Sequence, residues 1–307
     1  MAQSFQDYLG LDLHPRQAKP RSRGLTMVID IGYATGFVED ILAMYGHLLD
    51  VAKLTELHLT VPVQQLRRKV DAYKKHGVRV QPGGIILELG NAQNKGVQTL
   101  ERLHELGFDQ VEFSATASEA SDWAREKEML SAAKQLGFEV IGEVGRKFVE
   151  GDTTRKSERE LDLDATVAEM QAYLNAGASK VYFEGHVYRQ VVGNTADEIL
   201  AREKTGTAQV VELARRIGQD KIMFEVSGQM PYLQRRAQQF WLVRLFGPEV
   251  NVANVRLEEI QILEHTRLGT WPIFGFGPLG DHPYIKSAER GKGVASEKWW
   301  LETKRAA

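Results

Sequence analysis

Short runs of apolar, largely β-branched residues recur along this chain. Each run is followed by a stretch whose apolar residues return every three or four positions, which predicts a buried strand and then an amphipathic helix. Eight strands are expected, at residues 26–32, 50–56, 78–84, 110–114, 139–145, 179–185, 222–227 and 250–255. Neighbouring strands begin 24 to 43 residues apart, about the length of a strand with its helix. Eight such units predict an α/β fold, a (β/α)8 TIM barrel, with a doubly wound open sheet as the alternative.

The helix pattern also sets the domain boundaries. Glycines close four of the predicted helices, at Gly77, Gly107, Gly137 and Gly177. We expect the barrel at 25–268, after a polar N-terminal arm at 1–24 that either packs on a neighbour or is partly disordered. Residues 269–307 form a C-terminal Gly/Pro-rich extension, interpreted as a tail across the barrel or as a subunit contact.

Composition narrows the class of protein. The 307 residues are 43% hydrophobic and 26% charged, which is typical of a folded globular chain. Lys and Arg number 39 against 41 Asp and Glu, so the basic excess of a nucleic-acid-binding protein is missing. Cysteine is absent, which excludes disulfides, thiolate metal sites and a cysteine nucleophile. Neither a membrane span nor a signal-peptide core is seen, and we expect a cytoplasmic protein without a membrane partner.

Four consecutive predicted strands carry a glutamate near the carboxyl end. They are Glu112, Glu143, Glu184 and Glu225. Reacting groups of such barrels sit at this end, and a buried carboxylate is costly unless it is paired, hydrogen-bonded or bound to a cation. The set predicts a Mg²⁺ site, because Mg²⁺ prefers oxygen ligands. Alternatively, some of the glutamates form buried ion pairs that only tie strands together.

Several cations lie near the same predicted rim. Lys53 belongs to the second strand, and Arg146 and Lys147 follow the fifth. His186 and Arg189 follow Glu184, and Arg189 is the best candidate outside the strands for clamping a phosphate or carboxylate.

Polar and glycine positions complete the candidate binding surface. Asp30 ends the first strand and Asn254 lies in the eighth, where a turn or cap role is equally open. Gly83 and Gly84 would expose amide donors to an anion, and Ser227 opens a possible phosphate loop after strand seven. No GxSxG, HExxH, P-loop or dinucleotide motif is found in strand-to-helix context, which disfavours those enzyme classes.

Eight short sequence segments, in their order along the chain, resemble the phosphosulfolactate synthase family. They are MVIDIG, FVEDILAMYG, PGG, LGFDQVEFS, GFEVIGEVGRK, AGASKVYFEG, MFEVS and NVANV. The resemblance spans about residues 25–268 and extends, through AKPRSRGLT, to a plant branch associated with heat stress. It implies a (β/α)8 barrel and Mg²⁺-dependent addition of sulfite to phosphoenolpyruvate.

In that reaction a metal at the substrate carboxylate would stabilise an enolate-like anion. Lys147 would then protonate C2 or hold the sulfite, with Lys53 and Glu143 as the other catalytic candidates. We expect a small anionic substrate and a homo-oligomer.

The chain departs from the family pattern at several loops. Asp30-Ile31-Gly32 replaces Asp-Lys-Gly after strand one, and Leu54-Thr55-Glu56 replaces a Gly-rich loop after Lys53. Strand four lacks the acidic, Gly-Ser-rich turn, and His186 replaces an arginine. Losing cations and backbone donors weakens anion contacts. The expected function is therefore a synthase of this type, with an enzyme for a different small carboxylate or phospho acid, or a non-catalytic stress-related barrel, as alternatives.

Overall fold

Eight parallel strands form the centre of the computed structural model, which describes residues 4–10, 16–114, 123–145, 161–193, 195–200, 205–228 and 230–270. Every strand lies within its predicted range. The strands are β1 (Thr26–Asp30), β2 (Val51–Leu54), β3 (Arg79–Pro82), β4 (Gln110–Ser114), β5 (Glu139–Val144), β6 (Lys180–Phe183), β7 (Ile222–Glu225) and β8 (Val252–Val255).

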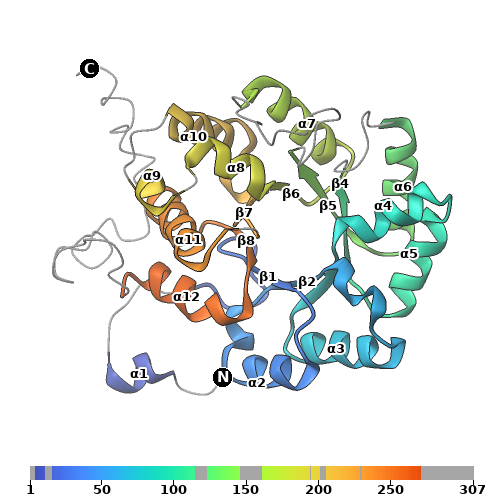
Figure 1. Cartoon of the computed structure of the whole chain (residues 1–307), viewed down its shortest axis with the longest axis horizontal. Helices are drawn as coiled ribbons and strands as arrows, with labels where there is room; N and C mark the ends of the chain where they lie inside the picture. Colours follow the sequence, from blue (N-terminus) through green and yellow to red (C-terminus); the bar gives the residue numbers. More distant parts are fainter. Residues whose placement is uncertain are drawn as a thin grey trace.

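Helices follow the strands and surround them (Figure 1). They are α1 (Phe5–Leu9), α2 (Thr35–Tyr45), α3 (Val63–Lys75), α4 (Gly84–Ala92), α5 (Gly96–Glu105), α6 (Trp123–Gln135), α7 (Leu163–Asn175), α8 (Gly185–Val192), α9 (Ala196–Leu200), α10 (Thr205–Ile217), α11 (Tyr232–Phe246) and α12 (Ile260–Leu268). A short 3₁₀ segment, η2 (Glu56–Thr60), lies between β2 and α3, and another, η4 (Leu257–Glu259), follows β8.

The strand order is β3-β2-β1-β8-β7-β6-β5-β4, so β3 and β4 are the two ends of the sheet. Near the starts of these strands, the Asp109 amide donates to the Val80 carbonyl at 2.9 Å, and the Val80 amide donates to the Asp109 carboxylate at 3.1 Å. These bonds bring the two ends together. The sheet is thus a nearly closed barrel, and the prediction of a (β/α)8 TIM barrel is confirmed.

Side chains in the barrel lumen change from apolar to charged along the strands. Val51, Ile141 and Met223 belong to a buried apolar cluster inside the barrel. Two residues further along the same strands, and so on the same face, stand Lys53, Glu143 and Glu225. The apolar layer therefore closes the lumen below a charged layer at the carboxyl ends of the strands.

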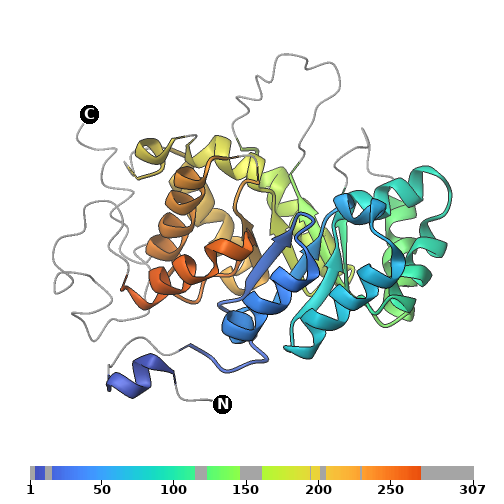
Figure 2. The same ribbon diagram turned by 60° about the horizontal axis from the view of Figure 1, so that its bottom comes forward.

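The N-terminal segment 16–24 packs on the opposite end of the barrel, as the view in Figure 2 shows. Arg21 pairs with Asp50 just before β2, and Arg16 pairs with Glu264 on α12 at 2.8 Å. Residues 16–24 of the predicted arm therefore lie on the barrel. The C-terminal extension is outside the described residues except for its first two positions. Within the described part of the chain, no helix is long and apolar enough to cross a membrane.

Candidate active site

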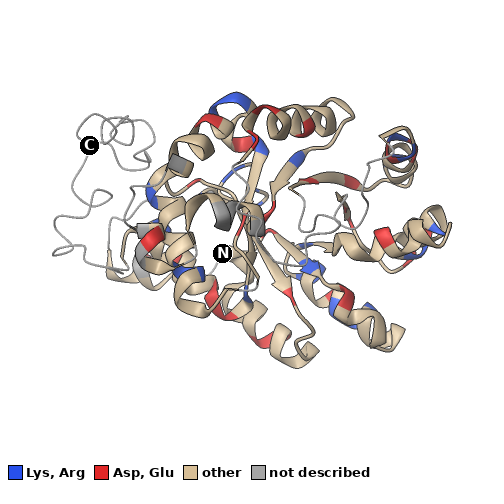
Figure 3. Cartoon of the chain, turned by 45° about the horizontal axis from the view of Figure 1, so that its top comes forward, with Lys and Arg blue, Asp and Glu red and all other residues tan. Residues whose placement is uncertain are grey.

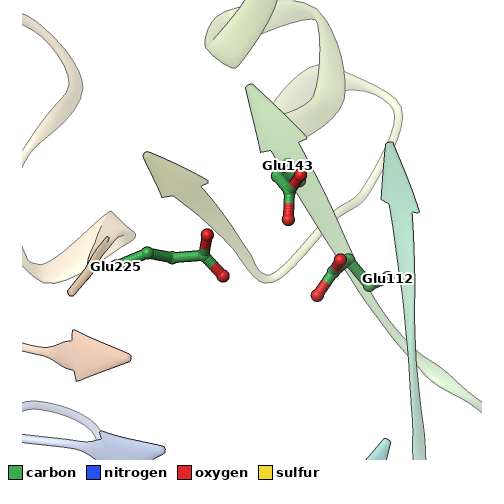
Figure 4. A group of neighbouring side chains, drawn as sticks. All are labelled: Glu112, Glu143 and Glu225. Atoms are coloured by element: carbon green, nitrogen blue, oxygen red, sulfur yellow. The ribbon is translucent and has the colours of Figure 1, made fainter. Parts of the chain in front are cut away.

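Three glutamates from three strands meet at the carboxyl end of the barrel. Glu112 on β4, Glu143 on β5 and Glu225 on β7 are all buried, and each offers an oxygen within 4.8 Å of the others. Figure 4 shows their carboxylates turned toward a shared space, and Figure 3 shows acidic positions on the central strands as well as on the outer helices. The structure therefore brings together three of the four predicted glutamates.

Lys53 enters the same space from β2. Its Nζ lies 2.6 Å from Oε2 of Glu112, 2.7 Å from Oε1 of Glu225 and 3.7 Å from Oε2 of Glu143. Burial opposes the positive charge of Lys53, but the three glutamates outweigh burial and hold its pKa well above the usual value. The lysine is therefore charged, and it compensates only part of the negative charge around it.

The surrounding charges and burial change the pKa of Glu112. Burial raises its pKa to about 8, the charge of Lys53 opposes the rise, and the carboxylates of Glu143 and Glu225 add to it. Among the described residues, Oε2 of Glu225 is buried and has no hydrogen-bond partner. The cluster is therefore short of positive charge, and a divalent cation would supply it.

Polar groups outside the glutamates hold Glu112 in place. The Gly84 amide donates to Oε1 of Glu112 at 3.2 Å, and Nε2 of Gln81 donates to Oε2 at 3.1 Å. A side chain at Gly84 would collide, because an added Cβ would lie 2.8 Å from that Oε1 and 2.6 Å from Oγ of Ser114. Gly84 is thus a position where the start of α4 and Glu112 approach closely. Gly83 precedes it, and its amide donates to the Leu54 carbonyl at 2.8 Å.

Asp30 lies in a separate buried cluster after β1. Oδ1 of Asp30 accepts the amides of Gly32 and Tyr33 at 2.9 and 3.0 Å, and Oδ2 accepts the Tyr73 hydroxyl at 3.0 Å. Lys69 of α3 lies 3.1 Å from Oδ2, and His58 of η2 lies 3.3 Å from Oδ1. Burial would raise the pKa of Asp30, but contacts with His58 and Lys69 hold it below the usual value. The structure shows Asp30 bracing the loops after β1 and β2; its predicted contact with substrate stays a prediction.

Ser227 and Asn254 belong to a second buried network, after β7 and β8. The Ser227 amide donates to Oε1 of Gln238 at 3.0 Å, so this donor is already used within the protein. Arg235 donates to the carbonyls of Ser227 and Asn254 at 2.8 and 2.6 Å, and it forms a bidentate ion pair with Glu259. Both side chains of that pair are fully buried. The network fixes the two loops relative to each other.

Four predicted residues have no described side-chain environment. Arg146 and Lys147 lie outside the described residues, so their roles stay predictions. His186 and Arg189 lie in the first two turns of α8, and their side chains are outside the described part. Glu184 is buried just after β6, but the group of three converging carboxylates does not include it.

Comparison with known proteins decides the family. Residues 14–272 match the family model of (2R)-phospho-3-sulfolactate synthase (ComA). The chain belongs to this family. It is 31% identical over 248 residues to the phosphosulfolactate synthase of Methanocaldococcus jannaschii, covering 80% of this chain and 92% of the relative. The Methanothermobacter thermautotrophicus enzyme of the same name is 30% identical over 259 residues, covering 83% and 92%.

Solved structures support the barrel alone. The carboxyl transferase domain of pyruvate carboxylase from Rhizobium etli aligns with a TM-score of 0.50 at 11% identity, covering 78% of this chain and 41% of that chain. At such low identity the likeness concerns the fold. It adds nothing on chemistry.

The rim above β1, β2 and β3 includes the loops after β1 and β2, two of the loops at which the sequence differs from the expected family pattern. The segments 31–37, 55–63 and 83–89, all described, contain no Lys or Arg. They expose apolar side chains instead: Ile31, Phe37, Leu57, Leu59, Val63, Ile85 and Leu89. Lys69, the lysine that reaches this side from α3, is buried in the Asp30 cluster. Cations for an anionic substrate are therefore missing from this part of the rim.

Sequence reasoning missed several residues that shape the site. Gln81, Tyr182, Lys69 and Arg235 contact predicted residues but carry no motif. Gln81 and Tyr182 could have been found from the alternation of side chains along β3 and β6. Each points into the lumen from the same strand face as the charged layer. Lys69 and Arg235 sit on helices, where an amphipathic pattern does not indicate a buried charge.

Proposed function

We propose that this chain is a Mg²⁺-dependent carbon-sulfur synthase of the phosphosulfolactate synthase type. It would add sulfite, or a related nucleophile, to phosphoenolpyruvate through an enolate-like intermediate. The observation that carries the proposal is the convergence of Glu112, Glu143 and Glu225 with Lys53 at the carboxyl end of the barrel. Family membership supplies the reaction class.

The residues present fit a magnesium ion. Their donors are all carboxylate oxygens, and the unpartnered Oε2 of Glu225 leaves one ligand atom ready. Glu112, Glu143 and Glu225 would hold the ion. A bound ion would displace the proton that Glu112 holds near neutral pH. With Lys53 charged, the three ionised carboxylates would then leave a deficit of two positive charges, which is the charge of Mg²⁺. When bound, the ion would stabilise negative charge developing at the substrate carboxylate.

The chain's own groups account for the remaining steps. The sulfur of sulfite forms a bond to C3 of phosphoenolpyruvate, and the electron pair of the C2–C3 double bond moves toward the carboxylate. A proton is then delivered to C2, and we assign that role to Lys147, which follows β5. Lys53, a fixed cation among the carboxylates, would orient the substrate carboxylate and favour the anion. Atoms and charge balance without an oxidant or reductant.

The remaining substrate contacts, the cellular location and the oligomeric state are part of the same proposal. Arg146 and Arg189 would bind the anionic groups, and His186, Gly83 and Gly84 would line the site. Under this proposal the enzyme works in the cytoplasm as a homo-oligomer on a small anionic substrate, without a nucleic-acid or membrane partner. The charge balance of 39 basic and 41 acidic residues supports the exclusion of nucleic acid.

One observation favours a second candidate, an enzyme for another small carboxylate or a non-catalytic barrel. The rim segments after β1, β2 and β3 lack Lys and Arg and expose apolar side chains. Phosphate and sulfite are both strongly anionic, and a rim without cations binds them weakly. Both forms of this candidate keep the carboxylate cluster. The enzyme would take a different substrate, and the non-catalytic barrel would take none.

A product assay tests the proposal. The full chain is incubated with Mg²⁺, phosphoenolpyruvate and sulfite, and phosphosulfolactate is sought by mass spectrometry. Product is expected from the wild type and not from Glu143→Gln, while Glu139→Gln, at the other end of β5, keeps activity. Metal binding without product would contradict the substrate pair and favour the second candidate. Absence of both product and metal binding would overturn the proposal.

A further inference from the structure

Tyr182 spans the barrel lumen to reach a residue on the far side. It lies on β6, is fully buried, and its hydroxyl donates to Oε1 of Gln81 on β3 at 2.8 Å. The ring of Tyr182 also lies under Lys53, whose Nζ is 4.9 Å from the ring centroid. One side chain therefore contacts the lysine through its face and the glutamine through its hydroxyl.

Gln81 links Tyr182 to Glu112 of the glutamate cluster. Its Nε2 donates to Oε2 of Glu112 at 3.1 Å, and Lys53 approaches the same oxygen at 2.6 Å. A glutamine amide is asymmetric, with a donor on one arm and an acceptor on the other. With the Tyr182 hydroxyl donating to the carbonyl arm, the NH₂ arm is left to face Glu112. The reverse orientation would place a carbonyl oxygen against a carboxylate.

We propose that Tyr182 and Gln81 are positioning residues of the active site, which together fix the carboxylate of Glu112 for metal binding. The inference rests on the proposed metal centre. Neither residue reaches the other two glutamates by a hydrogen bond that the structure shows. Their effect acts through Glu112, as hydrogen-bonded outer groups orient metal ligands elsewhere.

Tyr182→Phe separates positioning from packing. Phenylalanine keeps the buried ring and its contact with Lys53, but it removes the donor to Gln81. Oε1 of Gln81 is then buried without that donor, and the amide is free to turn away from Glu112. Tyr173→Phe is a matched control, because Tyr173 is also a buried tyrosine whose hydroxyl bonds a glutamate, Glu126, away from the lumen.

Calorimetric titration with Mn²⁺ alone, on the full chain, measures the effect. Tyr182→Phe is expected to weaken Mn²⁺ binding about tenfold, whereas Tyr173→Phe leaves Mn²⁺ binding unchanged. In the product assay, Tyr182→Phe should lower kcat more than it changes KM, and Tyr173→Phe should change neither. Gln81→Leu should weaken binding at least as much. Adding Tyr182→Phe to Gln81→Leu should change nothing further, because the tyrosine hydroxyl acts through the glutamine. Wild-type affinity in Tyr182→Phe, or additive effects in the double variant, would overturn the proposal.

A metal-independent readout keeps this inference distinct from the proposed function. In a crystal structure of metal-free Tyr182→Phe, the Gln81 amide and the Glu112 carboxylate are expected to move from their wild-type positions. Unchanged positions would overturn the positioning role even if the wild type binds no metal. Failure of wild-type metal binding, with the side chains displaced in the variant, would overturn the metal centre alone.

Discussion

At the residue scale, the charged layer inside the barrel depends on which side chains face one another across the lumen. Glu112, Glu143 and Glu225 were predictable from the sequence, because each stands near the carboxyl end of a strand. That Glu184 lies outside this group was not predictable, because all four glutamates share the same position near a strand end in the sequence. Lys53 was predicted as a cation of the rim. Its placement between Glu112 and Glu225 was not predictable, because it depends on how β2, β4 and β7 face one another across the lumen.

The pKa of Glu112 predicts an unusual pH dependence. A carboxyl group near pKa 4.5 when unfolded and about 8 when folded binds more protons in the folded state between those values. Stability of the metal-free protein should therefore fall as pH rises from about 5 to about 8, by on the order of 3 kcal/mol. Urea unfolding across this range measures it. Glu112→Gln should flatten the dependence, and an unchanged slope in that variant would refute the assignment.

Removing Lys53 should destabilise the fold. Lys53→Met leaves three buried carboxylates without their cation, and the expected loss in the free energy of unfolding is about 3 kcal/mol. Lys74→Met is the control, since the Lys74 pair with Asp109 is partly exposed and should cost less than about 1 kcal/mol. Denaturant unfolding of both variants measures the difference. Equal losses would show that Lys53 does not balance the cluster.

At the element scale, helices brace the loops at the rim. Lys69 of α3 holds Asp30 after β1, and Arg235 of α11 holds Glu259 and the loop after β7. In each case a charge on a helix satisfies backbone or carboxylate groups that a loop would otherwise leave buried and unpaired. Helix and strand positions follow from periodicity. These braces join residues 8 to 39 positions apart along the chain, and a hydrophobic pattern does not indicate them.

The Asp30 brace gives a prediction for the two loops it joins. Asp30→Asn leaves Lys69 buried without its carboxylate, and the expected loss is about 3 kcal/mol. Hydrogen exchange should increase mainly in 31–34 and 55–61. Adding Lys69→Met should recover part of the loss, because the stranded charge is removed. A double variant that is less stable than the single one would contradict this account.

At the scale of the whole molecule, the fold was predictable and the ends of the chain were less so. The repeat of strand and helix fixes eight units, and the structure places every strand within its predicted range. Parallel strands with helical crossovers then have few ways to close. The contacts of segment 16–24 with the barrel could not be predicted, since they depend on single arginines meeting carboxylates far along the chain.

That packing predicts how truncations behave. Removing residues 1–24 deletes Arg21 and leaves Asp50 buried without its arginine, so unfolding should be easier by about 3 kcal/mol. Removing residues 1–10 deletes only α1 and its flanks and should change stability by less than about 1 kcal/mol. Thermal and urea unfolding compare the two. Equal stability of both truncations would show that the segment does not hold the barrel.

Anomalous diffraction from crystals soaked in Mn²⁺ tests whether three strand-end glutamates form the metal centre of a synthase. One strong peak is expected within coordinating distance of Glu112, Glu143 and Glu225, and it should be absent in Glu143→Gln. A peak elsewhere, or none at a Mn²⁺ concentration that saturates known family members, would contradict this assignment.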